Sequence, residues 1–226
     1  MLDMAADRER MVDRQLARRG IHDRYVLEAM REVPREMFVR RKAQELAYED
    51  CALAIEAGQT ISQPYIVGLM LTAAEIRPGD RVLEIGSGSG YAAAVISRIA
   101  AHVYAIERHE ELTRLAARRL KRLGYTNIEL RTGDGTLGWP EAAPFDAVLV
   151  AAGGPAVPRG ITKQLAIGGR LVMPVGKTRH DQRLIKVRRH SAKHFSEEDL
   201  AGVRFVPLIG EHGWASGADF EPISEL

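Results

Sequence analysis

The sequence has little cysteine, little excess charge and no long apolar run. Its single cysteine, Cys51, cannot form a disulfide within the chain, which is typical of proteins that fold in a reducing compartment. No apolar run reaches the ~18 residues that a membrane-spanning helix needs. The opening MLDMAADRER lacks the apolar centre of a secretory signal. We therefore expect a soluble, cytoplasmic protein that has no membrane partner.

The charge balance gives no general attraction to nucleic acid. The formal net charge is +2, because 32 Lys and Arg residues are matched by 30 Asp and Glu residues. So small an excess draws the chain neither to nucleic acid nor to acidic lipid, and we expect neither as a partner. With 46% hydrophobic residues in a chain of 226, the composition is typical of one globular domain with a substantial core.

The N-terminal part of the chain is predicted to be helical and then irregular. Apolar residues recur with helical spacing over residues 4–19 and 23–33, and Gly20 and Pro34 are placed to end these two helices. Residues 36–61 alternate short apolar and polar pieces without a clear period. This pattern predicts irregular structure with a short strand or two.

From Pro64 onward, helical and strand patterns alternate. We predict helices over residues 64–76, 91–100, 110–123 and 159–166. We predict strands over residues 81–85, 102–107, 127–131, 145–151, 169–175, 184–188 and 203–209, the last two paired antiparallel. Alternation at intervals of ~20–25 residues is typical of a doubly wound α/β fold. The sequence therefore predicts a mostly parallel, seven-stranded Rossmann-like sheet with an N-terminal helical extension.

A glycine-rich loop, EIGSGSGY, follows the predicted strand over residues 81–85 and precedes a helix. Its glycines allow backbone amides to approach a ligand closely, although a flexible turn is the alternative. The dinucleotide fingerprint requires G-x-G-x-x-G, but here the third glycine, Gly90, comes one residue early. Glu84 would repel a diphosphate and attract an ammonium group. The loop therefore favours S-adenosylmethionine over NAD.

Two more polar features follow the next two predicted strands. Glu107 ends a strand about 20 residues after Gly86, where a carboxylate can accept both ribose hydroxyls of a nucleoside. Asp134 and Gly135 follow the third strand, and their carboxylate and backbone amide are placed to read the edge of an adenine. Taken singly, Glu107 could be surface decoration and Asp134-Gly135 an ordinary turn. Together with the glycine loop, they are much more specific.

The segment GQTISQP, from Gly58 to Pro64, combines two hydroxyl and two amide side chains between apolar segments. Ser62 has two interpretations. It can cap the helix that begins near Pro64, or it can bind a substrate. The local sequence leaves both open.

The chain resembles the protein-L-isoaspartate O-methyltransferases, a class I family that depends on S-adenosylmethionine. The resemblance extends over roughly residues 11–208. It rests on GQTISQP, VLEIGSGSGY, the GDG at Gly133, PFDAVLVAA from Pro144, QLAIGGRLVMPVG from Gln164 and VRFVPL from Val203. The glycine loop is general to methyltransferases, whereas TISQP and RFVPL are far more particular to this family.

The resemblance implies a reaction and a set of site residues. The methyl group passes from S-adenosylmethionine to the free α-carboxylate of an L-isoaspartyl residue in a damaged protein, and D-aspartyl residues are a second substrate. The products are S-adenosylhomocysteine and an ester, which then collapses to a succinimide. The implied cofactor residues are Glu84, Gly86, Ser87, Gly88, Glu107, Asp134 and Gly135. The implied substrate residues are Thr60, Ile61, Ser62 and Gln63, and Ser62 is the catalytic one.

A physical argument supports the substrate role of Ser62. The attacking carboxylate is already ionised at pH 7, so that no general base is required. A neutral hydroxyl can orient the carboxylate for in-line attack without neutralising it. Together with the resemblance, this argument favours the substrate role over the cap. Ser62 is then a positioning group and not a nucleophile.

The chain departs from the family pattern after the fourth predicted strand. Many relatives have a threonine and alanines where this chain has residues 151–154, AAGG, so we expect a different clamp on the peptide. We assign residues 1–62 to a helical extension and substrate loop of the same domain. Residues 63–210 form the cofactor-binding core and residues 211–226 a tail without a dependable match. We expect a monomer.

Two rival functions remain open in the sequence. One is a nucleic-acid methyltransferase, because Arg183, Lys186 and Arg188 belong to a basic cluster that could meet phosphate or protect a sheet edge. The segment AAGGP lacks the Asp/Asn-Pro-Pro-aromatic motif typical of enzymes that methylate base amino groups. The other rival is a sensor that binds the cofactor or peptide ends without turnover.

Two further residue patterns are set aside. His190 and His194 have a spacing that can bind zinc on a helix, but no cysteine lies nearby and we expect no metal. We expect Cys51 to be a small buried hydrophobic residue and not a nucleophile.

Overall fold

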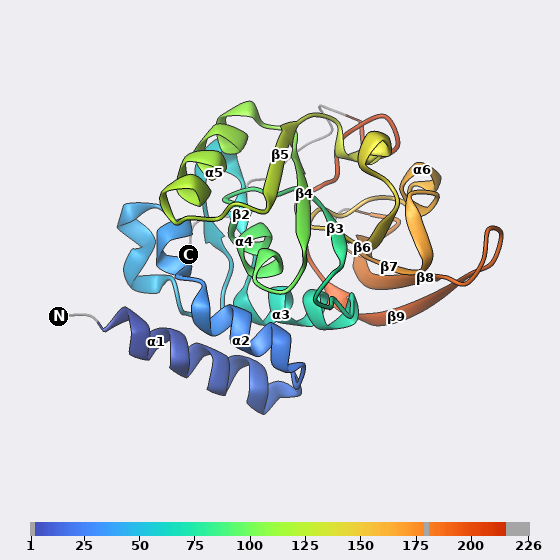
Figure 1. The fold of residues 1–226 in the computed structure, drawn as a ribbon. Coiled ribbons are helices and arrows are strands. Elements are labelled where there is room, and N and C mark those ends of the chain that lie inside the picture. The colour runs from blue at the N-terminus through green and yellow to red at the C-terminus, as the bar shows by residue number, and fades with distance from the viewer. Residues whose placement is uncertain (1–2, 179–180, 216–226) are drawn as a thin grey trace.

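The computed structural model describes residues 3–178 and 181–215 and contains a seven-stranded sheet of order β5-β4-β3-β6-β7-β8-β9 (Figure 1). The strands are β3 (Arg81–Ile85), β4 (His102–Glu107), β5 (Ile128–Thr132), β6 (Phe145–Val150), β7 (Leu165–Val175), β8 (Gln182–Arg189) and β9 (Phe195–Val203). The β5-to-β7 part is parallel, and β7, β8 and β9 pair antiparallel. The predicted seven-stranded, mostly parallel sheet is confirmed.

Both faces of the sheet are buried at its central strands β3 and β6, as neighbouring residues of β3 show. Val82 belongs to an apolar cluster that also holds residues of α1 to α5, whereas Leu83 belongs to a second cluster with Ile161. Successive side chains of a strand point to opposite faces, so that helices and loops cover the sheet on each side. This explains the nearly continuous apolar run of β6. The later helices are α3 (Pro64–Ala73), α4 (Tyr91–Ser97), α5 (Glu110–Arg122) and α6 (Arg159–Thr162).

The N-terminal helices form a layer against α3 and α4 (Figure 1). Helix α1 (Met4–Met11) continues through a π-helical turn, Val12–Leu16, and a 3-10 turn, Ala17–Arg19. Gly20 ends it at a φ of 92°, a left-handed conformation that favours glycine. Helix α2 (Arg24–Glu32) begins at Asp23, whose carboxylate accepts hydrogen bonds from the first-turn amides. Both predicted N-terminal helices are therefore present.

The following segment is irregular, as predicted, and carries one small hairpin. It contains the 3-10 turns η3 (Arg35–Phe38), η4 (Arg41–Leu46) and η5 (Glu56–Gly58), and the strands β1 (Leu53–Ala54) and β2 (Thr60–Ile61). Leu53 pairs with Ile61 across the antiparallel hairpin. The hairpin reaches the glycine loop, because a Cβ at Gly88 would lie 3.4 Å from Ile55.

The predicted helix over residues 159–166 is wrong in its second half. Helix α6 ends at Thr162, and Leu165 already pairs with Phe145 as the first residue of β7. The spacing of the apolar residues in this segment fits both a helix and a strand, and pairing with the neighbouring strand decides between the two. Helices α3 and α4 also end three residues before their predicted ends, at Ala73 and Ser97.

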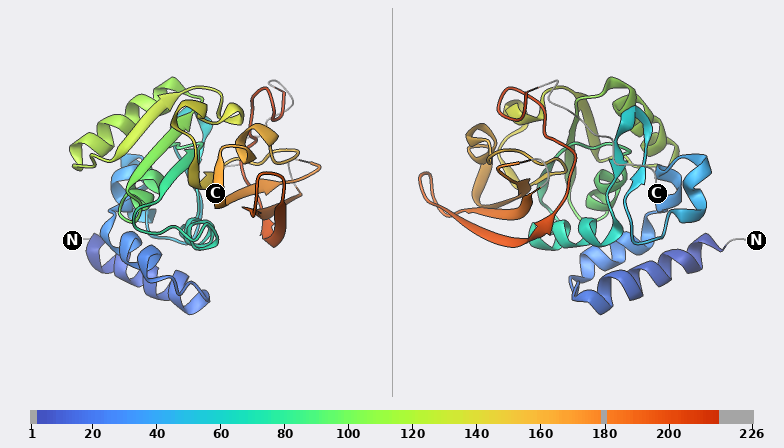
Figure 2. Two further views of the ribbon diagram at one scale, coloured as in Figure 1. Left: turned by 45° about the vertical axis from the view of Figure 1, so that its right-hand side comes forward. Right: turned by 180° about the vertical axis from the view of Figure 1, so that it is seen from behind.

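The predicted last strand over residues 203–209 is also wrong. The strand is β9, which forms a hairpin with β8 through a turn closed by the backbone bond from His190 to His194. The tip of this hairpin projects from the side of the molecule opposite the N-terminus (Figure 2). Three successive acids in β9 conceal the strand pattern. Within residues 204–215 the chain makes isolated bridges, including one between Gly153 and Pro207, and no strand.

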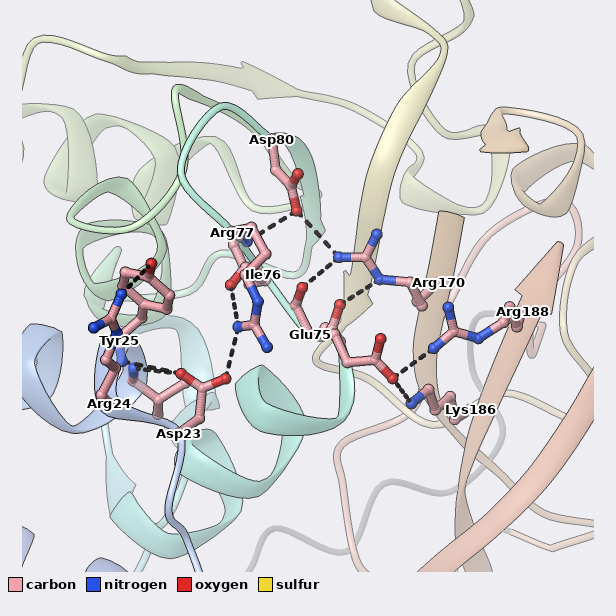
Figure 3. A network of polar contacts seen from close by, with 12 residues as sticks. Asp23, Arg24, Tyr25, Glu75, Ile76, Arg77, Asp80, Arg170, Lys186 and Arg188 are labelled. Carbon is pink, nitrogen blue, oxygen red and sulfur yellow. Dashed lines mark hydrogen bonds and ion pairs between the residues drawn. The ribbon is translucent and has the colours of Figure 1, made fainter. Parts of the chain in front are cut away.

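A polar network ties the end of α3 to the antiparallel edge of the sheet (Figure 3). Arg170 of β7 donates to the carbonyl oxygens of Ala74 and Glu75 at 2.8 and 2.5 Å. The Glu75 carboxylate accepts from Lys186 at 2.6 Å and from Arg188 at 2.5 Å. Burial would raise the pKa of Glu75, but the hydrogen bonds from Arg188 and Lys186 outweigh burial and lower it to about 2.

This network predicts an acid-dependent contribution to stability. Because the folded pKa of Glu75 lies below the ordinary value of 4.5, its contribution is present above pH 4.5 and is lost toward pH 2. We expect Glu75→Gln to reduce the free energy of unfolding at pH 7 by about 1 kcal/mol or less, since the pair is partly exposed. Urea unfolding followed by circular dichroism between pH 2 and 7 measures this difference. A difference that does not shrink on acidification would contradict the assignment.

Candidate active site

A cavity of about 690 Å³ lies at the carboxyl ends of β3, β4 and β6. This is the edge at which ligands bind in doubly wound sheets, where the strand order reverses. The cavity is lined by residues 57–62 of the hairpin, 84–89 and 91–92 around the glycine loop, 106–109 after β4, Gly135, Ala151, Ala152 and residues 206–209. The sheet thus brings together three features that the sequence singled out: the glycine loop, Glu107 and Gly135.

The glycine loop requires its glycines. Gly86, Gly88 and Gly90 have φ values of 86°, 52° and 88°, which residues with a Cβ rarely adopt. A Cβ at Gly90 would also lie 3.1 Å from Ala116 of α5. The loop therefore turns tightly into α4 and keeps its backbone close to the cavity.

Glu107 is fixed in the cavity wall by two backbone amides. One of its carboxylate oxygens accepts from Gly88 and the other from His109, both at 2.9 Å. Only 5% of its surface is exposed. Each carboxylate oxygen keeps acceptor capacity for a hydroxyl of a ligand. This geometry supports the ribose role that the sequence predicted for Glu107.

Glu84 also lines the cavity, but its charge state differs from the sequence-based expectation. It is 2% exposed, and its Oε2 atom has no hydrogen-bond partner. Burial raises the pKa of Glu84 to about 8, the charge of Glu107 adds to the rise, and a backbone hydrogen bond from Ala93 opposes it. The carboxyl group is therefore largely protonated at pH 7 in the protein alone. A cation placed beside it would favour the ionised form.

This raised pKa predicts how stability depends on pH. Between pH 4.5 and about 8, the folded protein keeps a proton on Glu84 that the unfolded chain has lost, so that the free energy of unfolding falls as pH rises. We expect Glu84→Gln to remove this fall. Between pH 4.5 and about 8, the free energy of unfolding of the variant should therefore rise by roughly 2–4 kcal/mol relative to that of the wild type. Urea unfolding of both proteins at pH 5, 6.5 and 8, without cofactor, provides the measurement. Parallel stability profiles would show that Glu84 ionises normally.

Gly135 lines the cavity, whereas Asp134 does not. A Cβ at Gly135 would approach Ile85 to 2.3 Å, so that the close packing against β3 requires glycine. The Asp134 carboxylate accepts from the backbone and hydroxyl of Thr136 at 2.8 and 2.7 Å and from the backbone of Glu211 at 2.8 Å. The geometry thus does not support the prediction that the Asp134 side chain reads an adenine edge. It anchors the chain around Glu211 instead.

Ser62 lies where the first cavity meets a second one of about 560 Å³. Thr60 and Ser62 line both cavities, Ile61 lines the first and Gln63 the second. The N-cap of α3 is Gln63, and no side chain caps the helix. The interpretation of Ser62 as the helix cap is therefore wrong. The role of Ser62 in binding a substrate stays a prediction.

The structure adds site residues that the sequence did not indicate. His109 and Tyr91 line the first cavity, and residues 181–182 and 202–206 line the second. His109 lies two residues after Glu107, the acid that ends β4, and this nearness is the one signal that could have identified it. Residues 206–209 were instead interpreted as part of a strand.

The structure also shows the surroundings of Cys51, His190 and His194. Cys51 is exposed, so its predicted burial is wrong, because it lies in the turn before β1. The rings of His190 and His194 lie 4.9 Å apart, and Nε2 of His190 contacts the Ser196 hydroxyl at 2.7 Å. Within residues 3–178 and 181–215, no group of three or more metal-ligating side chains comes together.

Comparison with known proteins identifies the family. A sequence model described as protein-L-isoaspartate(D-aspartate) O-methyltransferase matches residues 6–213. The chain belongs to this family. Relatives include protein-L-isoaspartate O-methyltransferase 2 of Pelobacter propionicus, 59% identical over 207 residues, with 92% of each chain covered. The protein-L-isoaspartate O-methyltransferase of Protochlamydia amoebophila is 53% identical over 204 residues, which cover 90% of this chain and 97% of the relative.

Two solved structures of the family have the same fold. A protein-L-isoaspartate O-methyltransferase superposes with a TM-score of 0.84 at 31% identity, over 91% of this chain and 67% of the other. A structure from Plasmodium falciparum, in complex with S-adenosyl-L-homocysteine, superposes with a TM-score of 0.77 at 25% identity, over 89% and 98%. The resemblance inferred from the sequence and the predicted fold class are both confirmed.

Proposed function

We propose that this protein is an enzyme that transfers a methyl group from S-adenosylmethionine to the free α-carboxylate of L-isoaspartyl residues in damaged proteins. The observation that carries this function is the position of Ser62 at the junction of two cavities. One cavity is built around the glycine loop and two acids, and the other opens toward residues 202–206. A D-aspartyl residue, whose free group is the side-chain β-carboxylate, is the minor substrate.

The residues of the first cavity fit S-adenosylmethionine. Backbone amides of the glycine loop are close to the cavity, Glu107 offers acceptors for the ribose hydroxyls, and the unpartnered oxygen of Glu84 suits an ammonium group. When bound, S-adenosylmethionine supplies the electrophilic methyl group on its sulfonium. Gly135 lines the same cavity, where the adenine would lie beside it.

The second cavity fits a peptide. It lies between the start of α3, which supplies Gln63 and Ile66, and the segment after β9. Its volume of about 560 Å³ suits a side chain together with flanking residues of a protein segment. Ala151 and Val206 line both cavities and bring the two ligands together.

Ser62 orients the substrate carboxylate for attack. The carboxylate is ionised at pH 7 and needs no base. The Ser62 hydroxyl donates to one carboxylate oxygen and leaves the other aligned with the methyl group at ~3 Å. Ile61, which is 4% exposed, helps to exclude water beside the reacting atoms.

The nucleic-acid and sensor alternatives have less support. Lys186 and Arg188 are paired with Glu75, and Arg183 with Asp199, so that the basic cluster of β8 serves the fold.

In the parts of the chain described, no helix is long and apolar enough to cross a membrane. A monomeric state and a cytoplasmic location belong to this proposal. Size-exclusion chromatography with light scattering tests the former.

The substrate assignment predicts a selective reaction. With labelled S-adenosylmethionine, we expect base-labile label on an isoaspartyl peptide and none on the matched aspartyl peptide. Ser62→Ala should lower kcat by about 10–100-fold, the loss of one hydrogen bond to a charged group, with unchanged cofactor affinity. Ser191→Ala, in the β8–β9 turn, is the control. Full turnover by Ser62→Ala would exclude its orienting role.

The cofactor assignment predicts a binding defect. Glu107→Ala should weaken the binding of S-adenosylmethionine by about 1–3 kcal/mol, because hydrogen bonds to a charged acceptor are lost. Isothermal titration calorimetry with S-adenosylhomocysteine, which does not react, gives the affinity. An unchanged affinity would mean that Glu107 does not bind the ribose.

A further inference from the structure

Arg35 is a fully buried cation without an acidic partner. It begins η3, and none of its surface is exposed, although it is the largest of the completely buried side chains. Among the residues that the structure describes, no carboxylate lies within ion-pair distance of it. Burying an unpaired charge is costly, so specific contacts must hold this guanidinium in place.

The contacts of Arg35 lead to both sides of the candidate active site. Nε donates to the carbonyl oxygen of Ala47 and Nη2 to the carbonyl oxygen of Ser62, each at 2.8 Å. The guanidinium carbon lies 4.9 Å from the ring centre of Tyr91, the first residue of α4. Ser62 lines both cavities and Tyr91 lines the first, whereas Arg35 lines neither.

The hydrogen bond from Arg35 reaches Ser62 in a short segment between β2 and α3 that belongs to neither element. The β1–β2 ladder ends at Ile61, and α3 begins at Pro64 without a side-chain cap. The charge-assisted bond from Arg35 fixes the peptide group between these two elements. A rotation of that peptide would turn the Ser62 hydroxyl away from its position. Displacements of ~1 Å at a reacting centre can reduce rates about 100-fold.

Tyr91 gives Arg35 a fixed surface on the cofactor side. Tyr91 is 1% exposed, and its position is set by the glycine loop that precedes it. Burial raises the pKa of Tyr91 to about 12, although the charge of Arg35 opposes the rise. The tyrosine is therefore a neutral phenol at pH 7, and the cation packs against its ring.

We infer that Arg35 is the positioning residue that sets the Ser62 hydroxyl relative to the cofactor cavity for methyl transfer. This inference rests on the proposed role of Ser62 in orienting the substrate. Arg35 acts through the Ser62 main chain and through Tyr91, and it does not touch the reacting atoms.

Arg170 supplies a matched control. Its side chain is 12% exposed and, like Arg35, donates to two main-chain carbonyl oxygens, those of Ala74 and Glu75. Unlike Arg35, it also pairs with a carboxylate, that of Asp80, at 3.1 Å. The two carbonyl contacts lie at the end of α3 (Figure 3), and none of the three residues that make them lines either cavity. A lysine at either position keeps the charge but cannot make the same forked pair of bonds. A purely structural role of Arg35 therefore predicts the same behaviour for both variants.

The experiment compares Arg35→Lys with Arg170→Lys. We measure the melting temperature, the affinity for S-adenosylhomocysteine by calorimetry, and kcat and KM on an isoaspartyl peptide. Each kcat is calculated per cofactor-binding site, so that inactive protein does not lower it. Both variants should melt at lower temperature. Arg35→Lys should lower kcat by about tenfold or more with cofactor affinity within about threefold, whereas Arg170→Lys should change kcat by less than about twofold. Equal kcat values for the two variants would overturn the inference.

A double-mutant cycle with Ser62→Ala isolates the coupling. If Arg35 acts through the Ser62 hydroxyl, Arg35→Lys should reduce kcat by less than about threefold in the Ser62→Ala background. Multiplicative losses would overturn the inference while leaving the role of Ser62 intact. Full turnover by Ser62→Ala alone would instead defeat the proposed role of Ser62. If Arg35→Lys does not fold, Arg35→Gln, whose amide reaches one carbonyl, replaces it with the same expected and contrary results.

Discussion

The hydrogen bonds that hold β3 between β4 and β6 determine where every part of the site lies. Ile85 is paired with Ile106 on one side and Val150 on the other. Just after β3 and β6 end, two more backbone hydrogen bonds continue this pairing. Gly86 donates to Ile106 and Ala151 donates to Ile85, each at 2.8 Å. The loops that follow β3, β4 and β6 therefore all leave the sheet side by side at the same edge. The cavity is the space that these loops leave between them.

The second ligand site depends on elements outside the sheet. The β1–β2 hairpin and the N-terminal helices supply Ser62 and its support, and the segment after β9 supplies the facing wall. In the proposed function, the loops of the sheet hold the cofactor and the additions determine the choice of substrate. Arg35 joins the two parts, because one guanidinium contacts residues of both.

The sequence predicted the central strands well because their signals are local. The apolar residues of β3 and β4 are buried on both faces, and glycine or a charged residue ends each strand. The start of β7 and the whole of β9 could not be placed in the same way, since strand pairing decides both. Among the site residues, the ionisation of Glu84 and the alternative bonds of Asp134 depend on burial and on neighbours distant in sequence. The contact between Arg35 and Ser62 likewise joins residues far apart in the chain, and no local pattern indicates it.

The anchoring of Asp134 bears on the chemical ageing of the protein itself. Asp134-Gly135 is the one Asp-Gly pair in the sequence, and an unbranched glycine after aspartate leaves the backbone nitrogen open to form a succinimide. Burial would raise the pKa of Asp134, but hydrogen bonds from Glu211 and Thr136 outweigh it and keep the carboxyl group ionised. An ionised carboxylate held by several donors is a poor electrophile. The fold therefore protects, beside its own active site, the kind of bond whose damage its family repairs.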